Sequence, residues 1–301
     1  MRAKVTFPGA YHHVMNRGVM GENIFIDNKA KDYFLNIIRA KSQLQRIKIL
    51  AYCIMDNHYH LILEDTSSRL SEFMRHVNGQ YGIYYRKRVS GKGYVFQDRY
   101  KSILIQGDVY LKMAIAYVLL NPLRGRITEN PCEYRWTSIM EYFTGKSSNL
   151  VDNTFVEALF KNKERMDEFL EDWTGKDIPV KRTRFGDILG NKKFIEEAVE
   201  KFDRRKSKGK STRKRLNDYI FEHPEEVINR FEEEMGSSID EIKVETREGK
   251  RLRSELLVLL KDRSGLKYGE IKKYKPFSSL KYSSLGQIYK RAKDNMEKEK
   301  S

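Results

Sequence analysis

Two histidines, His58 and His60, lie one residue apart in the stretch MDNHYHLILE (residues 55–64). The composition of this stretch predicts a β-strand. Because side chains at positions i and i+2 of a strand point to the same face, the two imidazoles would lie side by side. Such a pair can bind one metal ion. The alternative is a pair of structural histidines, although burying two rings carries a desolvation cost.

A tyrosine and an asparagine lie further along the chain, in AYVLLNP (residues 116–122). At helical spacing, Tyr117 and Asn121 are one turn apart on the same face. If this face packs beside the histidine strand, Asn121 can supply an oxygen ligand and Tyr117 can place its hydroxyl near the ion. Imidazole and amide ligands, with open positions for water and phosphate, suit Mg²⁺ or Mn²⁺. Alternatively, Tyr117 fills the core and Asn121 caps the helix before Pro122.

The spacing of apolar residues predicts the elements that would position these side chains. Strands are predicted over residues 11–18, 48–55, 58–64 and 93–106 (the last as a strand or hairpin), and helices over 28–44, 67–88 and 107–122. The order is therefore β-α-β-β-α-β-α. Its first six elements match the ferredoxin-like pattern, an α+β fold in which an antiparallel sheet carries its helices on one face.

The rest of the chain is predicted to be an α-helical region. Residues 204–215 hold eight basic side chains, which suit either phosphate binding or a solvated surface. Residues 248–295 resemble a helix-turn-helix whose last helix would enter the DNA major groove, and a plain packing domain is the alternative. The basic side chains of that last helix are Lys281, Lys290 and Arg291. We expect three domains: a catalytic domain at 1–130, a helical connector at 131–200 and a basic helical domain at 201–301.

The composition favours a polyanionic partner. The 301 residues include 58 Lys and Arg against 42 Asp and Glu, which gives a net charge of +16. Nucleic acid is the first expectation, and an anionic membrane surface is the second. No apolar run approaches the ~20 residues that span a bilayer, and no secretory signal is present. With only Cys53 and Cys132, the sequence fits a reducing compartment. We expect a soluble bacterial protein in the cytoplasm, associated with the nucleoid.

The two halves of the candidate site together resemble a known family. MDNHYHLIL, followed about sixty residues later by AIAYVLLNPLRGRI, resembles the single-tyrosine HUH transposases, in particular the IS200-like, REP-associated tyrosine transposases. The stretches YHHVMNRG and GYVFQDRYKS are also similar to this family, and the resemblance covers roughly residues 5–145. Tyr59 is a small departure, because an aliphatic residue is common at this position in the family.

The resemblance implies both a set of site residues and a reaction. His58, His60 and Asn121 would hold Mg²⁺ or Mn²⁺, and Tyr117 would be the nucleophile. Cleavage of single-stranded or hairpin DNA would leave a 5′-phosphotyrosine and a free 3′-hydroxyl, and a second 3′-hydroxyl could rejoin the strand without ATP. The candidate DNA contacts are Arg17, Arg99 and Lys101, together with Lys281, Lys290 and Arg291.

Several residue assignments stay open. Tyr100 is a rival nucleophile. His12 and His13 alternate across a strand, so at most one of them faces the site. Three further tyrosines are expected to pack in the core or to stack on DNA bases: Tyr81, Tyr84 and Tyr85.

Other functions also fit the sequence. The alternatives are a non-enzymatic, sequence-specific DNA-binding regulator, a metal-dependent nuclease that uses water, and an RNA-processing enzyme. Tyr117 could act with the histidines of its own subunit or with those of a neighbour, so a monomer and a homodimer are both compatible with the sequence.

Overall fold

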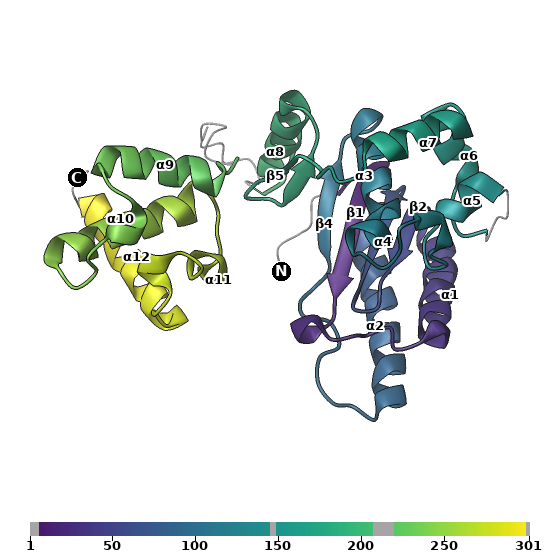
Figure 1. The fold of residues 1–301 in the computed structure, drawn as a ribbon, viewed down its shortest axis with the longest axis horizontal. Helices are drawn as coiled ribbons and strands as arrows, with labels where there is room; N and C mark the ends of the chain where they lie inside the picture. The colour runs from purple at the N-terminus through teal and green to yellow at the C-terminus, as the bar shows by residue number, and fades with distance from the viewer. Residues whose placement is uncertain (1–5, 145–148, 207–219, 299–301) are drawn as a thin grey trace. The chain divides into compact units, whose positions relative to one another are not determined.

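The computed structural model describes residues 6–144, 149–206 and 220–298. It divides into two compact units (Figure 1). Unit 1 comprises Met1–Val180 with Gly186–Ala198, and unit 2 comprises Lys181–Phe185 with Val199–Ser301. No helix in the described part of the chain is long and apolar enough to cross a membrane. Most of the basic segment at 204–215 lies outside the described residues.

A sheet organises unit 1, with its strands in the order β2-β3-β1-β4-β6. Four strands pair antiparallel: β1 (Ala10–Arg17), β2 (Ile47–Ile54), β3 (His58–Asp65) and β4 (Lys101–Ile105). One short strand, β6 (Asp187–Leu189), extends the sheet beyond β4 and is parallel to it. A further short strand, β5 (Val180–Arg182), lies at the boundary between the two units. The first four strands and the helices between them have the order of a ferredoxin-like unit, which confirms the predicted α+β fold.

Helices α1 (Asn28–Gln45) and α2 (Leu70–Val89) share one face of this sheet, as predicted. Tyr59 on β3 points into this layer. Its ring packs against Phe34 of α1 at 4.8 Å between centroids, and its hydroxyl donates to the side-chain oxygen of Asn78 on α2 at 2.8 Å. Tyr59 is therefore fully buried with its polar atom satisfied.

Helix α3 (Val109–Leu119) packs on the opposite face, against β2, β3 and β4. The alternation of side chains along β3 establishes this arrangement. Tyr59 contacts the layer of α1 and α2, whereas the next residue, His60, has its ring beside that of Tyr117 on α3. The ferredoxin-like sheet is thus covered on both faces, and α3 is the helix that covers the histidine face.

Two elements are shorter than predicted. The helix expected over 107–122 ends at Leu119, and a single turn, α4 (Asn121–Arg124), follows it. Pro122 lacks a backbone N–H and cannot continue the ladder of helical hydrogen bonds, which accounts for the break. The strand expected over 93–106 is confined to β4, because the preceding residues form a loop with a single bridge next to the end of β1.

The segment predicted to be a helical connector contains both helices and strands. Its α-helices are α5 (Ile139–Thr144), α6 (Asn153–Phe160), α7 (Lys163–Asp172) and α8 (Lys192–Lys206), and it begins with a 3-10 turn, η2 (Pro131–Glu133). Another 3-10 turn, η1 (Val19–Gly21), follows β1. Strands β5 and β6 also fall within it, because the open edge of β4 provides hydrogen-bonding partners for β6. The spacing of residues within this segment could not predict these strands, because the pairing partner β4 is distant in sequence.

Unit 2 is helical. Its elements are α9 (Pro224–Met235), η4 (Ile239–Glu241), α10 (Arg247–Asp262), α11 (Tyr268–Ile271), η5 (Lys275–Phe277) and α12 (Tyr282–Lys298). Apolar side chains of α10, α11 and α12 form its core, among them Leu256, Ile271 and Leu285. Gly265 makes the turn after α10 with a φ of +64°, and a Cβ there would lie 2.3 Å from the ring of Phe221.

Candidate active site

His58 and His60 begin strand β3 and point to the face that α3 covers. Their ring centroids are 5.0 Å apart, and the ring planes are nearly perpendicular, at 88°. His60 is buried, with 6% of its surface exposed, and His58 is partly exposed. The i, i+2 spacing thus brings the two imidazoles together on one face, as the strand geometry predicts.

A buried lysine supports the turn that leads into β3. Lys31 on α1 is 6% exposed, and its ammonium donates to the carboxylate of Asp56 at 2.6 Å. It also donates to the hydroxyl of Tyr134 at 3.3 Å, and this hydroxyl donates to the carbonyl of Ile54 at 2.8 Å. These bonds tie the end of β2 and the turn to helix α1. No sequence pattern indicated a role for Lys31, because a lysine on an amphipathic helix is ordinarily exposed.

Burial keeps both imidazoles uncharged at neutral pH. It lowers the pKa of His60 well below its usual range, and neighbouring rings and Arg124 act in the same direction. Burial also lowers the pKa of His58, although a hydrogen bond with the Asn121 side chain opposes this effect. The Nδ1 atom of His58 lies 2.5 Å from the side-chain oxygen of Asn57. An uncharged imidazole has the lone pair that a metal ligand needs.

Tyr117 on α3 has its ring beside two histidine rings of the sheet. Its ring centroid is 6.2 Å from that of His60 and 5.7 Å from that of His13, both in edge-to-face arrangements. Tyr117 is partly buried. A single chain therefore brings together the phenol of Tyr117 and the histidine pair. The sequence analysis could state the packing of this helix beside the histidine strand only as a condition, and in the structure α3 does pack against β3.

Asn121 lies one helical turn beyond Tyr117 and is 8% exposed. Its side-chain nitrogen donates to the Tyr117 carbonyl at 3.1 Å, so the amide oxygen is left for another partner. No group of three or more His, Cys, Asp or Glu side chains that could hold a metal ion occurs among the described residues. The candidate set is instead mixed, with two imidazoles and one amide oxygen. Completed by water and phosphate oxygens, it fits Mn²⁺ or Mg²⁺.

Arg124 is a residue of this site that the sequence analysis missed. Its guanidinium lies 4.5 Å from the ring centroid of Tyr117. Its Nη1 donates to the carbonyl of Lys176 at 2.6 Å, and its Nη2 is paired with the carboxylate of Asp177. Arg124 is seven residues, or about two helical turns, after Tyr117, and this spacing was the available signal. The partners at 176 and 177 had no signal, because they are distant in sequence.

The predicted DNA-contacting cations of unit 1 lie at exposed positions. Arg17 pairs with His58 across β1 and β3, and its Nε donates to the side chain of Gln97. Lys101 pairs with Met15, which pairs in turn with His60, so Lys101 shares the histidine face of the sheet. Arg99 is exposed in the loop before β4. In unit 2, the exposed predicted contacts are Lys281, Lys290 and Arg291.

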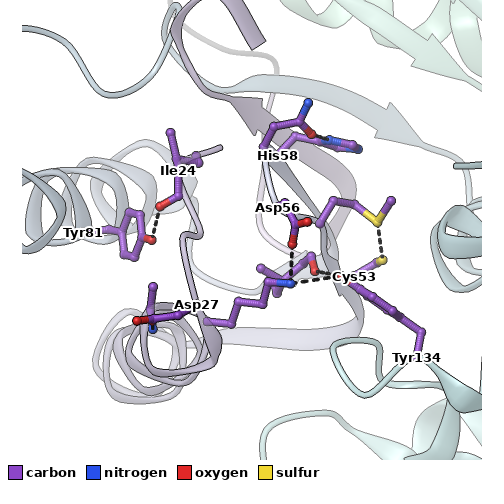
Figure 2. A network of polar contacts seen from close by, with 12 residues as sticks. Ile24, Asp27, Cys53, Asp56, His58, Tyr81 and Tyr134 are labelled. Atoms are coloured by element: carbon purple, nitrogen blue, oxygen red, sulfur yellow. Dashed lines mark hydrogen bonds and ion pairs between the residues drawn. The ribbon is translucent and has the colours of Figure 1, made fainter. Parts of the chain in front are cut away.

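The other candidate tyrosines lie elsewhere. Tyr100 precedes Lys101 and points to the opposite face, where its hydroxyl lies 3.2 Å from that of Ser71 on α2. Tyr81 is fully buried and donates to the carbonyl of Ile24 at 2.6 Å (Figure 2). The remaining two, Tyr84 and Tyr85, are partly exposed on α2.

Two comparisons concern curated proteins and solved structures. No curated protein matches the sequence. Among solved structures, a REP-associated tyrosine transposase bound to a REP hairpin is 13% identical, covers 50% of this chain and 88% of its own, and has a TM-score of 0.41. A candidate transposase from Deinococcus radiodurans is also 13% identical, covers 43% and 93%, and has a TM-score of 0.29.

One part of the chain matches a family model. Residues 6–120 match the model of IS200-like transposases. The matched range runs from β1 to the end of α3, and therefore contains the four antiparallel strands, His58, His60 and Tyr117. Residues 6–120, which are less than half of the chain, are thus similar to the IS200-like transposase family.

Proposed function

We propose that the chain is a metal-dependent enzyme that cleaves single-stranded DNA and rejoins it through a 5′-phosphotyrosine at Tyr117. One observation carries the proposal: the rings of Tyr117 and His60 are 6.2 Å apart within a domain similar to the IS200-like transposase family. Transfer of a phosphodiester requires an aligned nucleophile and charge stabilisation at the same place. The phenol of Tyr117 would be the nucleophile, and a cation held by the paired imidazoles beside it would supply the charge stabilisation.

Each side chain of the site has a role in this proposal. The hydroxyl oxygen of Tyr117 bonds to phosphorus as the bond to the 3′-oxygen breaks, the phenol proton passes to solvent, and the 3′-oxygen takes up a proton. His58, His60 and Asn121 would hold Mg²⁺ or Mn²⁺, which supplies positive charge at the phosphate oxygens. Arg124 contributes a further fixed cation beside the phenol ring. Attack by a second 3′-hydroxyl on the phosphotyrosine releases Tyr117 and rejoins the strand.

Single-stranded DNA, or a hairpin with single-stranded flanks, is the proposed substrate. The net charge of +16 favours a nucleic acid, and Arg17 and Lys101 are exposed cations on the histidine face. A single strand is flexible enough to enter a site beside a sheet. The exposed cations of α12 and of the residue before it would add duplex binding, as in a helix-turn-helix.

The test is incubation of the protein with Mn²⁺ and a labelled DNA hairpin that has single-stranded flanks, followed by denaturing gel electrophoresis. The wild-type protein should give a covalent protein–DNA band. Tyr117→Phe should abolish the band, and Tyr100→Phe, the matched control on the opposite face of the sheet, should retain it. An RNA hairpin of the same sequence should give no band.

The other outcomes correspond to other functions. Cleavage without a covalent band would identify a nuclease that uses water. Specific binding without cleavage, unchanged in Tyr117→Phe, would identify a non-enzymatic regulator. A band that persists in Tyr117→Phe and disappears in Tyr100→Phe would move the nucleophile to Tyr100.

A further inference from the structure

A third histidine lies directly behind the candidate metal ligands. His13, in the middle of β1, is 0% exposed, and its Nε2 lies 2.8 Å from Nδ1 of His60. The two ring centroids are 5.0 Å apart. His13 also has its ring beside that of Tyr117, at 5.7 Å between centroids. One side chain thus contacts both a proposed metal ligand and the proposed nucleophile, yet the proposed function gives it no part.

We propose that His13 is a positioning residue that fixes the ring of His60 through the bond between their nitrogens and so directs the other nitrogen of His60, Nε2, to the metal. This inference rests on the proposed function, because it concerns the same metal site. A metal-bound histidine generally uses its second ring nitrogen to bond a neighbour, and that neighbour sets the ring orientation and the tautomer. For His60, the neighbour is another imidazole.

The position of the protons follows from this arrangement. A metal at Nε2 of His60 needs the lone pair of that nitrogen, so the single ring proton of His60 must be on Nδ1 and must be donated to His13. His13 then accepts at Nε2 and carries its own proton on Nδ1. The tautomers of the two rings are therefore coupled, and only one of the two directions of this hydrogen bond leaves His60 able to bind a metal through Nε2.

The environment of Nδ1 of His13 argues against a purely structural role for this side chain. The Nδ1 atom of His13 is buried and has no hydrogen-bond partner among the described residues. An unsatisfied buried polar atom costs about 1–3 kcal/mol of stability, and native proteins contain few of them. A histidine that served packing alone would be replaced by an apolar residue at no such cost. The retained imidazole is explained by the bond that it makes with His60.

The adjacent residue, His12, provides a matched control. It is also 0% exposed and lies on the same strand, but it points to the opposite face. Its Nδ1 lies 3.0 Å from the hydroxyl of Ser102, and its Nε2 lies 3.0 Å from that of Thr6. Substitution of His12 therefore perturbs β1 and the core to a similar extent without touching the proposed metal site.

The experiment measures Mn²⁺ affinity of the full chain by titration calorimetry without DNA. His13→Leu should weaken Mn²⁺ binding about 10- to 100-fold, the range observed when the partner of a metal ligand is removed. His13→Gln, whose amide can reach the place of Nε2, should restore most of the affinity, whereas the shorter His13→Asn should not. His12→Leu should bind as wild type. Circular dichroism at the same temperature confirms that each variant is folded.

Three outcomes would overturn the inference: wild-type affinity in His13→Leu and His13→Asn, equal losses in His12→Leu and His13→Leu, or Mn²⁺ binding that does not depend on His60 in a His60→Ala variant. The covalent-band assay on the same samples tests the proposed function separately. Mn²⁺ binding that follows the expected order without a Tyr117–DNA band would reject the strand-transfer reaction and uphold the role of His13.

Discussion

The guanidinium of Arg124 lies 4.5 Å from the ring centroid of Tyr117, and two of its nitrogens bond the peptide carbonyl of Lys176 and the carboxylate of Asp177. The segment that follows α7 therefore reaches back to the candidate nucleophile. A cation stacked on an aromatic ring and held by two further partners has little rotational freedom, so it also limits the freedom of the ring. Arg124 thus connects the phenol to a part of the chain beyond the matched domain.

We expect Arg124→Ala to slow formation of the covalent DNA adduct about tenfold, because a partly desolvated cation–π contact is worth about 1–2 kcal/mol. Arg124→Lys keeps the charge without the planar stack and should be intermediate. Single-turnover kinetics on a labelled hairpin measure these rates. Asp177→Asn, which removes only an exposed partner, should have a smaller effect. Equal rates for Arg124→Ala and wild type would rule out a contribution of Arg124.

The assembly of the site within one chain predicts the result of a mixing experiment. The ring centroids of Tyr117 and His60 are 6.2 Å apart within one chain. An equimolar mixture of the Tyr117→Phe and His60→Ala proteins should therefore form no covalent adduct with DNA. If the active protein exchanged α3 between two chains, the mixture would contain a site with both native residues and would recover part of the activity. Denaturing gels of the mixture distinguish the two cases, with wild type diluted twofold as the reference.

The ion pair of Lys31 and Asp56, in which only the lysine is buried, predicts unequal effects of substitution on stability. The Lys31 side chain is 8% exposed, whereas that of Asp56 is 58% exposed. Asp56→Ala leaves a buried ammonium without its carboxylate and should lower the free energy of unfolding by about 1–3 kcal/mol. Lys31→Met should cost less, because it keeps the volume and leaves the carboxylate in water. Urea denaturation measures both, with exposed Asp32→Ala as the control. The reverse order would contradict this account.

The cap of helix α1 predicts a pH-dependent difference in stability. Hydrogen bonds from Arg88 and from the backbone N–H of Ala30 lower the pKa of Asp27 from its usual 3.8 to about 2. The unfolded chain therefore takes up the proton first as pH falls, so the stabilisation by Asp27 is full above pH 3.8 and is lost toward pH 2. Wild type should exceed Asp27→Asn in urea midpoint at pH 7, and the gap should close between pH 4 and pH 2.

A background variant tests the cause of that gap. In an Arg88→Gln background, the loss of stability caused by Asp27→Asn should be smaller at pH 7, because the two guanidinium bonds at 2.8 and 2.9 Å are gone. A gap that is unchanged by Arg88→Gln would assign the stability of this cap to its backbone hydrogen bond, whereas a gap that is constant with pH would contradict the lowered pKa of Asp27.

Local spacing predicted much of the fold and part of the site. The i, i+2 spacing of His58 and His60 needs only the geometry of a strand, and the structure has both rings on one face of β3. The i, i+4 spacing of Tyr117 and Asn121 needs only a helical turn, and the Asn121 side chain bonds the Tyr117 carbonyl. The alternation of periodicities likewise predicted the ferredoxin-like order of elements. The residue roles stay predictions until the assays above are done.

Other features depended on packing between distant segments. The sequence allowed one of His12 and His13 to face the site, but the pairing of β1 with β3 and the packing of α3 decided that it is His13. Lys31 is buried because α1 packs against the turn before β3 and because Tyr134 and Trp136 lie beside its ammonium. Arg124 is fixed by residues that follow it by more than fifty positions.

By itself, the sequence determined which side chains share a face of one element, because backbone geometry over a few residues sets that periodicity. Only the tertiary structure decided which faces meet: the phenol over the histidines, the third histidine behind them and the arginine over the phenol. Those contacts come from burying apolar surface and pairing strands over long distances in the chain, and no local pattern records them.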